Sequence, residues 1–120
     1  MSNIQDTLDS LREVPGIKGA ALVTPDGIVI ASSLSASLDS EVVAGLASFL
    51  ITTTRRSLNE GGLGAFSRFV LQATNGKILL MDLGESFLVV HTDQFARLES
   101  SRMEVEEAAR EIQRASRVNV

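Results

Sequence analysis

Few side chains in this sequence have the types and spacing that enzymatic chemistry requires. The 120 residues include a single histidine, His91, and no cysteine. A lone histidine cannot form a cluster of metal ligands, and no serine-nucleophile signature accompanies it. The missing cysteines also exclude a thiolate nucleophile and a disulfide framework. We therefore expect no catalytic residue, no metal site and no cofactor, and we interpret His91 as a structural residue.

The remaining chemical candidates are carboxylates near predicted turns and one glycine-rich run. Two neighbouring carboxylates can serve as general acid and base. Placement in or beside turns explains the four candidates without that role; they are Asp26, Asp82, Glu85 and Asp93. The run Gly-Gly-Leu-Gly at 61–64 lacks the Gly-Lys-Ser/Thr ending of a phosphate-binding loop, and it follows a helix instead of preceding one. We interpret it as a helix stop, so the sequence indicates no reaction.

Composition and charge exclude several classes of partner. The chain carries 15 acidic and 11 basic residues, a net charge of −4, and the basic ones are dispersed. Nucleic acids and anionic membrane surfaces need a concentrated basic patch, which this sequence lacks. No apolar run approaches the roughly 18 residues that span a bilayer, and the N-terminus lacks the pattern of a secretory signal. We expect a cytoplasmic protein that binds no nucleic acid and does not insert into a membrane.

Periodicity and turn residues predict one domain over residues 1–120. Helices are expected at 2–14, 39–60 and 100–117, and strands at 17–24, 28–33, 66–74, 77–83 and 86–92. Ser2 with Gln5 predicts a capping box on the first helix, and Asp39 predicts a cap on the second. The Asn75-Gly76 pair predicts a tight hairpin between the third and fourth strands.

The strand patterns also predict the order of the sheet. The first, fourth and fifth strands are apolar on both faces, which is typical of central strands covered on two sides. The third strand alternates polar and apolar residues, and the second ends in Ser32-Ser33, so both are expected at edges. With three hairpins, the order 2-1-5-4-3 follows. We predict an α/β (α+β) fold of element order α-β-β-α-β-β-β-α, with an antiparallel sheet and helices on both faces.

The predicted helix at 39–60 is too apolar for one sheet to cover. On a helical wheel its apolar arc spans about 200°, against about 100° for a typical core-facing stripe. One side carries Val42, Val43, Leu46, Phe49 and Leu50, and an adjacent side carries Ala44, Ala47, Ile51 and Leu58. We expect the first side to face the sheet. The second side then faces another protein chain, unless a terminal helix or loop of the same chain covers it.

Segments spread over nearly the whole chain together match a known family pattern. Residues 16–23, Gly-Ile-Lys-Gly-Ala-Ala-Leu-Val, run into residues 26–32, Asp-Gly-Ile-Val-Ile-Ala-Ser. A long helix then ends at Gly61-Gly62, and later strands contain Leu83-Gly84 and the run Phe-Leu-Val-Val at 87–90. As an ensemble, the sequence resembles the roadblock family of dynein light chains and bacterial GTPase regulators.

The resemblance implies a homodimer in which the long helices of two copies pair and their third strands join two sheets into one. In this sequence it places strand 66–74 and one side of helix 39–60 at the interface. The expected interface residues are Ala44, Ala47, Ile51, Leu58, Phe66, Arg68 and Val70. The helical wheel points to the same helix independently, and dimerisation gives the edge strand a partner.

The resemblance further implies a non-catalytic regulator or scaffold of a small Ras-like GTPase, with the bacterial gliding-motility partner as the nearest functional analogue. The outer polar sector of the helix, Ser48, Thr52 and Arg55, is the expected GTPase contact. Such a protein either reshapes the switch loops or donates an arginine finger; the finger candidates are Arg55, Arg56 and Arg68. Two alternatives stay open: a structural adaptor whose binding ignores the nucleotide, such as a motor light chain or signalling scaffold, and a small-molecule sensor.

Overall fold

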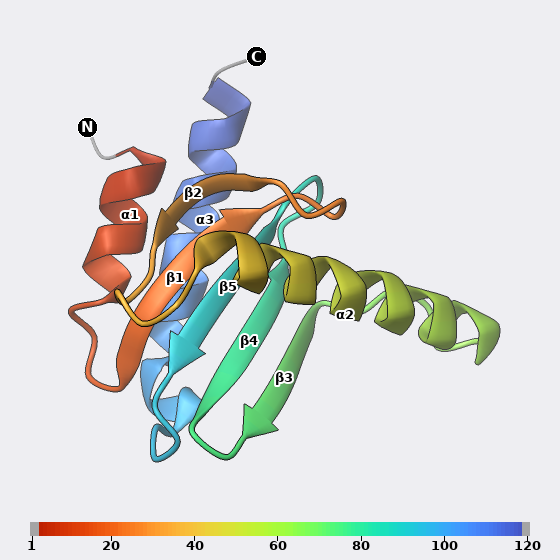
Figure 1. The fold of residues 1–120 in the computed structure, drawn as a ribbon. Coiled ribbons are helices and arrows are strands. Elements are labelled where there is room, and N and C mark those ends of the chain that lie inside the picture. The colour runs from red at the N-terminus through yellow and green to blue at the C-terminus, as the bar shows by residue number, and fades with distance from the viewer. Residues whose placement is uncertain (1–2, 119–120) are drawn as a thin grey trace.

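Three helices and five strands follow the predicted order along the chain in the computed structural model, which describes residues 3–118 (Figure 1). The elements are α1 (Ile4–Leu11), β1 (Ile17–Val23), β2 (Val29–Ser33), α2 (Ser40–Glu60), β3 (Arg68–Ala73), β4 (Gly76–Asp82), β5 (Phe87–Thr92) and α3 (Arg102–Val118). A 3₁₀ turn, η1 (Leu98–Ser101), leads directly into α3. The predicted element order is therefore confirmed, with small shifts at the boundaries.

The strands form one antiparallel sheet in the predicted order β2-β1-β5-β4-β3. β1, β4 and β5 lie inside it because their side chains are apolar on both faces and need cover from both. All four residues from Phe87 to Val90 in β5 are buried, for example. β3 lies at an edge and is largely exposed or half-buried. Its register with β4 is set by a two-residue turn of Thr74 and Asn75, one residue earlier than the predicted Asn75-Gly76 pair, because Gly76 pairs with Ala73 as the first residue of β4.

Helices cover the two faces of the sheet, and each face has its own core (Figure 1). α1 and α3 pack together on one face, where Leu8 and Ile112 are almost fully buried. α2 packs on the other face, and its core includes Val23, Leu80 and Phe87. In Figure 1, α2 crosses one end of the sheet and extends beyond β3, so part of this face has no helix over it.

Local hydrogen bonds explain where the helices begin and end. Asp39 caps α2 as predicted, because its carboxylate accepts a 2.8 Å bond from the N–H of Glu41. Asn3 caps α1 in the same way; the predicted cap by Ser2 lies outside the described residues. α2 ends where the N–H of Leu63 bonds back to Leu58, which requires the positive φ of Gly62. Among the described residues, no helix is both long and apolar enough to cross a membrane.

Candidate interaction surface

The side of α2 that lies on the sheet is centred on residues that were predicted to face another chain; of the predicted sheet-facing side, only Val43 is buried in this core and Leu50 packs partly against it. Ala44, Ala47 and Ile51 are at most 2 % exposed and pack in the core against the sheet. The expectation that they face another chain is wrong. The reason is size, because alanines let the helix approach the sheet closely and larger side chains would hold it away. Leu58, placed on the same predicted side, is half-buried against the same core.

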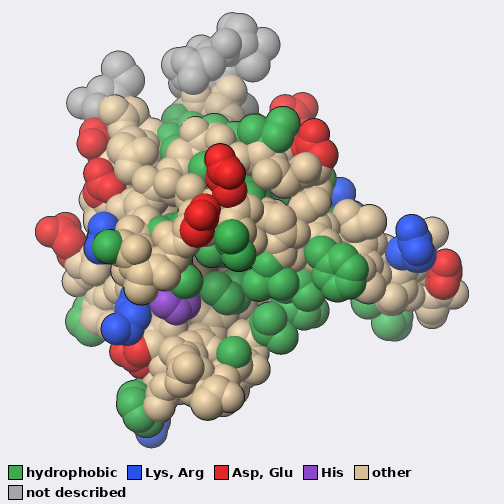
Figure 2. Space-filling model, viewed as in Figure 1, with side chains coloured by type: hydrophobic (Ala, Val, Ile, Leu, Met, Phe, Trp, Pro, Cys, Tyr) green, Lys and Arg blue, Asp and Glu red, His purple; other side chains and the backbone are tan. Residues whose placement is uncertain are grey.

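The outward side of α2 carries large apolar side chains instead. Val42 is 68 % exposed, Leu46 43 % and Phe49 66 %. Their spacing of i, i+4 and i+7 places them in one stripe along the first half of the helix. A core position was predicted for all three, and the structure contradicts it. Figure 2 shows apolar side chains gathered along α2 and over the adjoining sheet. We call these three residues the α2 stripe.

On the face that carries α2, the sheet presents half-buried apolar side chains that sequence reasoning did not assign to a site. The strand register places Phe69 with Leu80, and Leu71 with Ile78, on the face that carries α2. Phe69, Leu71 and Ile78 keep part of their surface accessible. We call these three residues the sheet shelf. The alternation of β3, with Phe69 and Leu71 separated by polar or exposed neighbours, is the signal that could have identified it.

The β3 edge of the sheet is open. The carbonyl of Ser67 accepts a 3.0 Å bond from the N–H of Asp82, so residue 67 is hydrogen-bonded to β4. Because this bonding alternates along an antiparallel strand, the backbone groups of Arg68, Val70 and Gln72 point away from the sheet. Arg68 and Val70 are exposed there. Their predicted position at the strand edge is therefore confirmed, whereas their role at a dimer interface stays a prediction.

Phe66, also predicted at the interface, belongs to the core. It is 9 % exposed, and its ring stacks on Phe87 with centroids 5.9 Å apart. Phe87 contacts a cation as well, since the guanidinium of Arg55 lies 4.8 Å from its centroid. These contacts join the loop before β3, the start of β5 and the second half of α2 into one packed unit. Phe66 thus supports the surface without forming it.

The predicted polar sector of α2 is partly engaged within the chain. The Ser48 hydroxyl donates a 2.7 Å hydrogen bond to the carbonyl of Pro25, which ties the β1–β2 turn to the helix. Arg55 lies 3.6 Å from the carboxylate of Asp82 in addition to its contact with Phe87. Thr52 and Arg56 are exposed on the same helix. The structure therefore gives Ser48 and Arg55 internal partners and leaves Thr52 accessible.

His91 lies on the sheet face that carries α2, opposite Ile78 in the register. Its Nδ1 is buried and has no hydrogen-bond partner among residues 3–118. Burial, together with the positive charge of Lys18, lowers the pKa of His91 below its usual value of 6.5, against the opposing effect of Asp93. In the part of the chain that the structure describes, no three His, Cys, Asp or Glu side chains come together as metal ligands.

The fold and this surface define a class: a five-stranded antiparallel sheet between one long helix and two terminal ones, with exposed apolar side chains on the long helix. The Roadblock/LC7 domain family matches residues 3–92. The chain belongs to the Roadblock/LC7 domain family.

Individual proteins are also similar to this chain in sequence or in structure. The uncharacterized protein MJ1340 of Methanocaldococcus jannaschii is 38 % identical over 109 residues, which are 91 % of this chain and 96 % of the relative. The structure of Myxococcus xanthus MglB superposes with a TM-score of 0.89 at 20 % identity, covering 98 % of this chain and 90 % of MglB. A structure of MglB in a tetrameric arrangement gives a TM-score of 0.84 at 20 % identity, with the same coverage of both chains.

Proposed function

We propose that this chain is a non-catalytic, homodimeric regulator or scaffold of a small Ras-like GTPase. One observation carries the homodimer: exposed apolar side chains gather along α2 and over the adjoining sheet, whose β3 edge is open. Exposed apolar patches of this kind mark protein interfaces, and an open strand edge is a template for a second strand. The resemblance to MglB in a tetrameric arrangement supports self-association.

The proposed dimer pairs β3 of one copy with β3 of the second copy in antiparallel fashion. Placing Val70 opposite its own counterpart sets Arg68 against Gln72 of the second copy and separates the two arginines, which repel when directly opposed. The part of α2 that extends beyond β3 then lies over the sheet shelf of the second copy (Figure 1). The long helices of the two copies also lie side by side in this arrangement, so that the α2 stripe of each copy packs against the second copy.

The experiment for the dimer is light scattering coupled to size-exclusion chromatography. We expect wild-type protein to run as a dimer and the Phe49→Glu variant to run as a monomer, since a buried unpaired carboxylate opposes association. Phe95→Glu is the matched control, because Phe95 is 82 % exposed in the loop after β5, away from α2. A dimeric Phe49→Glu variant, or a monomeric wild type, would overturn the proposed dimer.

The GTPase part of the proposal rests on family membership and on the exposed polar side of α2 around Thr52, which we call the free flank. Thr52 is exposed on that flank, one turn from Ser48 and its bond to the β1–β2 turn. We propose that this flank contacts the switch loops of the GTPase and selects one of their conformations. Arg55 is not our choice for an arginine finger, because Asp82 and Phe87 hold its guanidinium.

A binding measurement tests the GTPase part separately from the dimer. Calorimetry with a small GTPase of the same organism, loaded with GDP or with a GTP analogue, should show tighter binding in one state. Thr52→Arg should weaken that binding without changing the dimer. Equal binding in both nucleotide states favours the alternative of a structural adaptor. No binding to any such GTPase overturns this part of the proposal and leaves the dimer standing.

A further inference from the structure

A groove lies on the other layer of the molecule, between α1 and α3. The two helices pack through buried residues such as Leu11 and Val105. At the outer surface, residues of α1, η1 and α3 and of the segment after α1 line this groove of about 630 Å³, which we call the α1–α3 groove. Because α2 and β3 lie on other parts of the molecule, the proposed dimer leaves this groove open, and a dimer would carry two of them.

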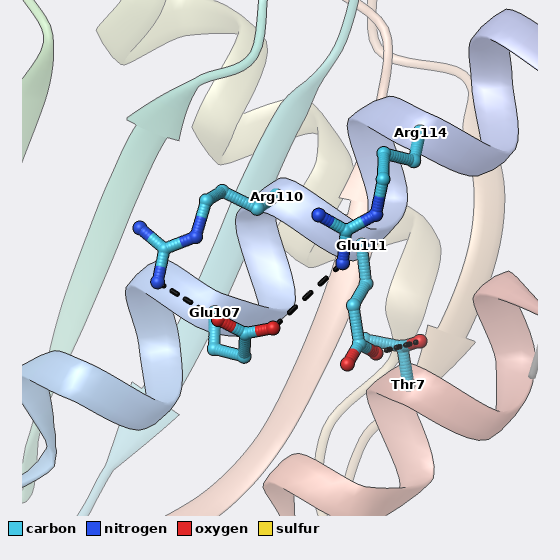
Figure 3. A network of polar contacts seen from close by, with 5 residues as sticks. All are labelled: Thr7, Glu107, Arg110, Glu111 and Arg114. Atoms are coloured by element: carbon cyan, nitrogen blue, oxygen red, sulfur yellow. Dashed lines mark hydrogen bonds and ion pairs between the residues drawn. The ribbon is translucent and has the colours of Figure 1, made fainter.

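The walls of the α1–α3 groove are strongly acidic. Four glutamates line it against one arginine, Arg110; they are Glu99, Glu104, Glu107 and Glu111. Figure 3 shows how two of them are held: Glu107 lies between Arg110 and Arg114, and Glu111 accepts a 3.2 Å hydrogen bond from Thr7 of α1. The bond from Arg110 lowers the pKa of Glu107, so this carboxylate is ionised at neutral pH. Glu99 and Glu104 are exposed.

The groove also offers apolar contacts between its charges. Met103 is 80 % exposed at the groove, and Val14 and Ala108 line it as well. Methionine is flexible and polarizable, which suits a surface that adapts to another side chain. An exposed apolar anchor surrounded by carboxylates is complementary to a segment with one apolar residue and several basic ones. The same charge pattern repels nucleic acid and anionic lipid.

We propose that the α1–α3 groove docks a basic, amphipathic segment of another protein. Along η1 and α3 the acidic residues extend from Glu99 to Glu111, which corresponds to about 20 Å and accommodates about three turns of a bound segment. An apolar side chain of the segment packs against Met103, and its lysines or arginines pair with the exposed carboxylates of Glu99 and Glu104. This interaction is independent of the GTPase contact and adds a second partner class to the domain.

The probe for this inference is a 12-residue peptide with leucines on one helical face and lysines on the other. We expect amide chemical-shift changes in labelled protein to concentrate in residues 99–111, with saturable binding below about 1 mM. A peptide of the same composition with the helical pattern broken should bind more weakly. Shifts spread over the surface, shifts confined to another region, or no saturable binding would each overturn the proposal.

Matched double variants distinguish the contribution of the groove to peptide binding from that of the overall negative charge. Glu99→Gln with Glu104→Gln should weaken peptide binding about fivefold, as expected for two lost ion pairs. Glu41→Gln with Glu60→Gln removes the same charge from exposed positions of α2 and should change the affinity less than about twofold. An equal loss in both double variants would show that only the net charge attracts the peptide, and this would contradict the docking site.

Discussion

At the scale of single residues, size and charge decide what each side chain of α2 contributes. Ala44 and Ala47 bring the helix close to the sheet, and Ile51 fills the space beside them. Phe49, a much larger side chain, lies on the other side and stays exposed. The same helix therefore has one side that stabilises the monomer and another that is available to a second chain.

The burial of Ile51 predicts a larger effect of substitution there than at an exposed position on another helix. Ile51→Ala should lower the free energy of unfolding by about 3 kcal/mol, because it opens a cavity in the core. Met103→Ala, at an exposed position, should change it by less than about 0.5 kcal/mol. Urea denaturation of both variants at one protein concentration measures the difference. Similar small changes for both would show that Ile51 does not belong to the core.

His91 predicts a dependence of stability on pH. Its pKa is lowered in the folded protein, so the unfolded chain binds the proton more readily. The stabilisation is fully present above the usual pKa of about 6.5 and is lost as the pH falls toward and through the folded value. Urea denaturation between pH 8 and pH 5 should show wild type losing more stability than His91→Gln. Parallel curves for the two proteins would contradict this.

A substitution at Lys18 provides an independent check, since the positive charge of Lys18 contributes to the lowered pKa of His91. Lys18→Gln should raise the pKa of His91 toward its usual value. Because His91 is the only histidine of the chain, its ring protons give one NMR titration curve that needs no assignment. An unchanged curve in the variant would mean that burial alone lowers the pKa.

At the scale of elements, the two edge strands differ in what occupies their free backbone groups. On β2, the amide of Gln5 in α1 donates a 2.9 Å hydrogen bond to the carbonyl of Ser32. Such cover protects a strand from pairing with another chain. In β3, the backbone groups of Arg68, Val70 and Gln72 point outward from the sheet. The terminal helix therefore leaves one edge of the sheet for association.

Cross-linking tests which edge pairs. A Val70→Cys variant should form a covalent dimer with a short bismaleimide, because opposed residues in antiparallel strands lie about 5.5 Å apart between Cα atoms. Ile30→Cys is the control at the other edge, where Ile30 of β2 is also about half exposed. Denaturing electrophoresis resolves the products. Equal cross-linking of the two variants, or none in either, would contradict pairing through β3.

At the scale of the whole molecule, the two layers present different surfaces. The α2 layer and β3 present apolar surface, and the α1–α3 layer presents an acidic groove. A dimer formed through the first layer stabilises the fold by mass action, since only the folded chain can associate. The second layer stays free, so partners on the two layers do not compete for the same surface.

Mass action predicts that thermal stability depends on protein concentration. A hundredfold increase should stabilise the dimer by about 2.7 kcal/mol and raise Tm by several degrees. Phe49→Glu should remove this dependence, whereas Phe95→Glu should keep it. Scanning calorimetry at several concentrations measures the effect. A wild-type Tm that does not change with concentration would show that folding and association are not coupled.

The sequence was sufficient for the element order, the strand order and the two-sided coverage of the sheet. These features depend on neighbouring residues: Asp39 caps α2, the turn at Asn75 sets one hairpin, and doubly apolar strands must lie inside the sheet. The family pattern is readable for the same reason, because it consists of such local signals. The sequence also marked α2 as having more apolar surface than one sheet covers.

Only the tertiary structure decided which side of α2 faces the sheet. A helical wheel gives the angle of each side chain but not the distance between two packed surfaces, and that distance favours Ala44 and Ala47 over Phe49. The burial of Phe66, the exposure of the sheet shelf and the groove between α1 and α3 depend on the same long-range packing. Residues far apart in the chain determine these features together, so no local pattern contains them.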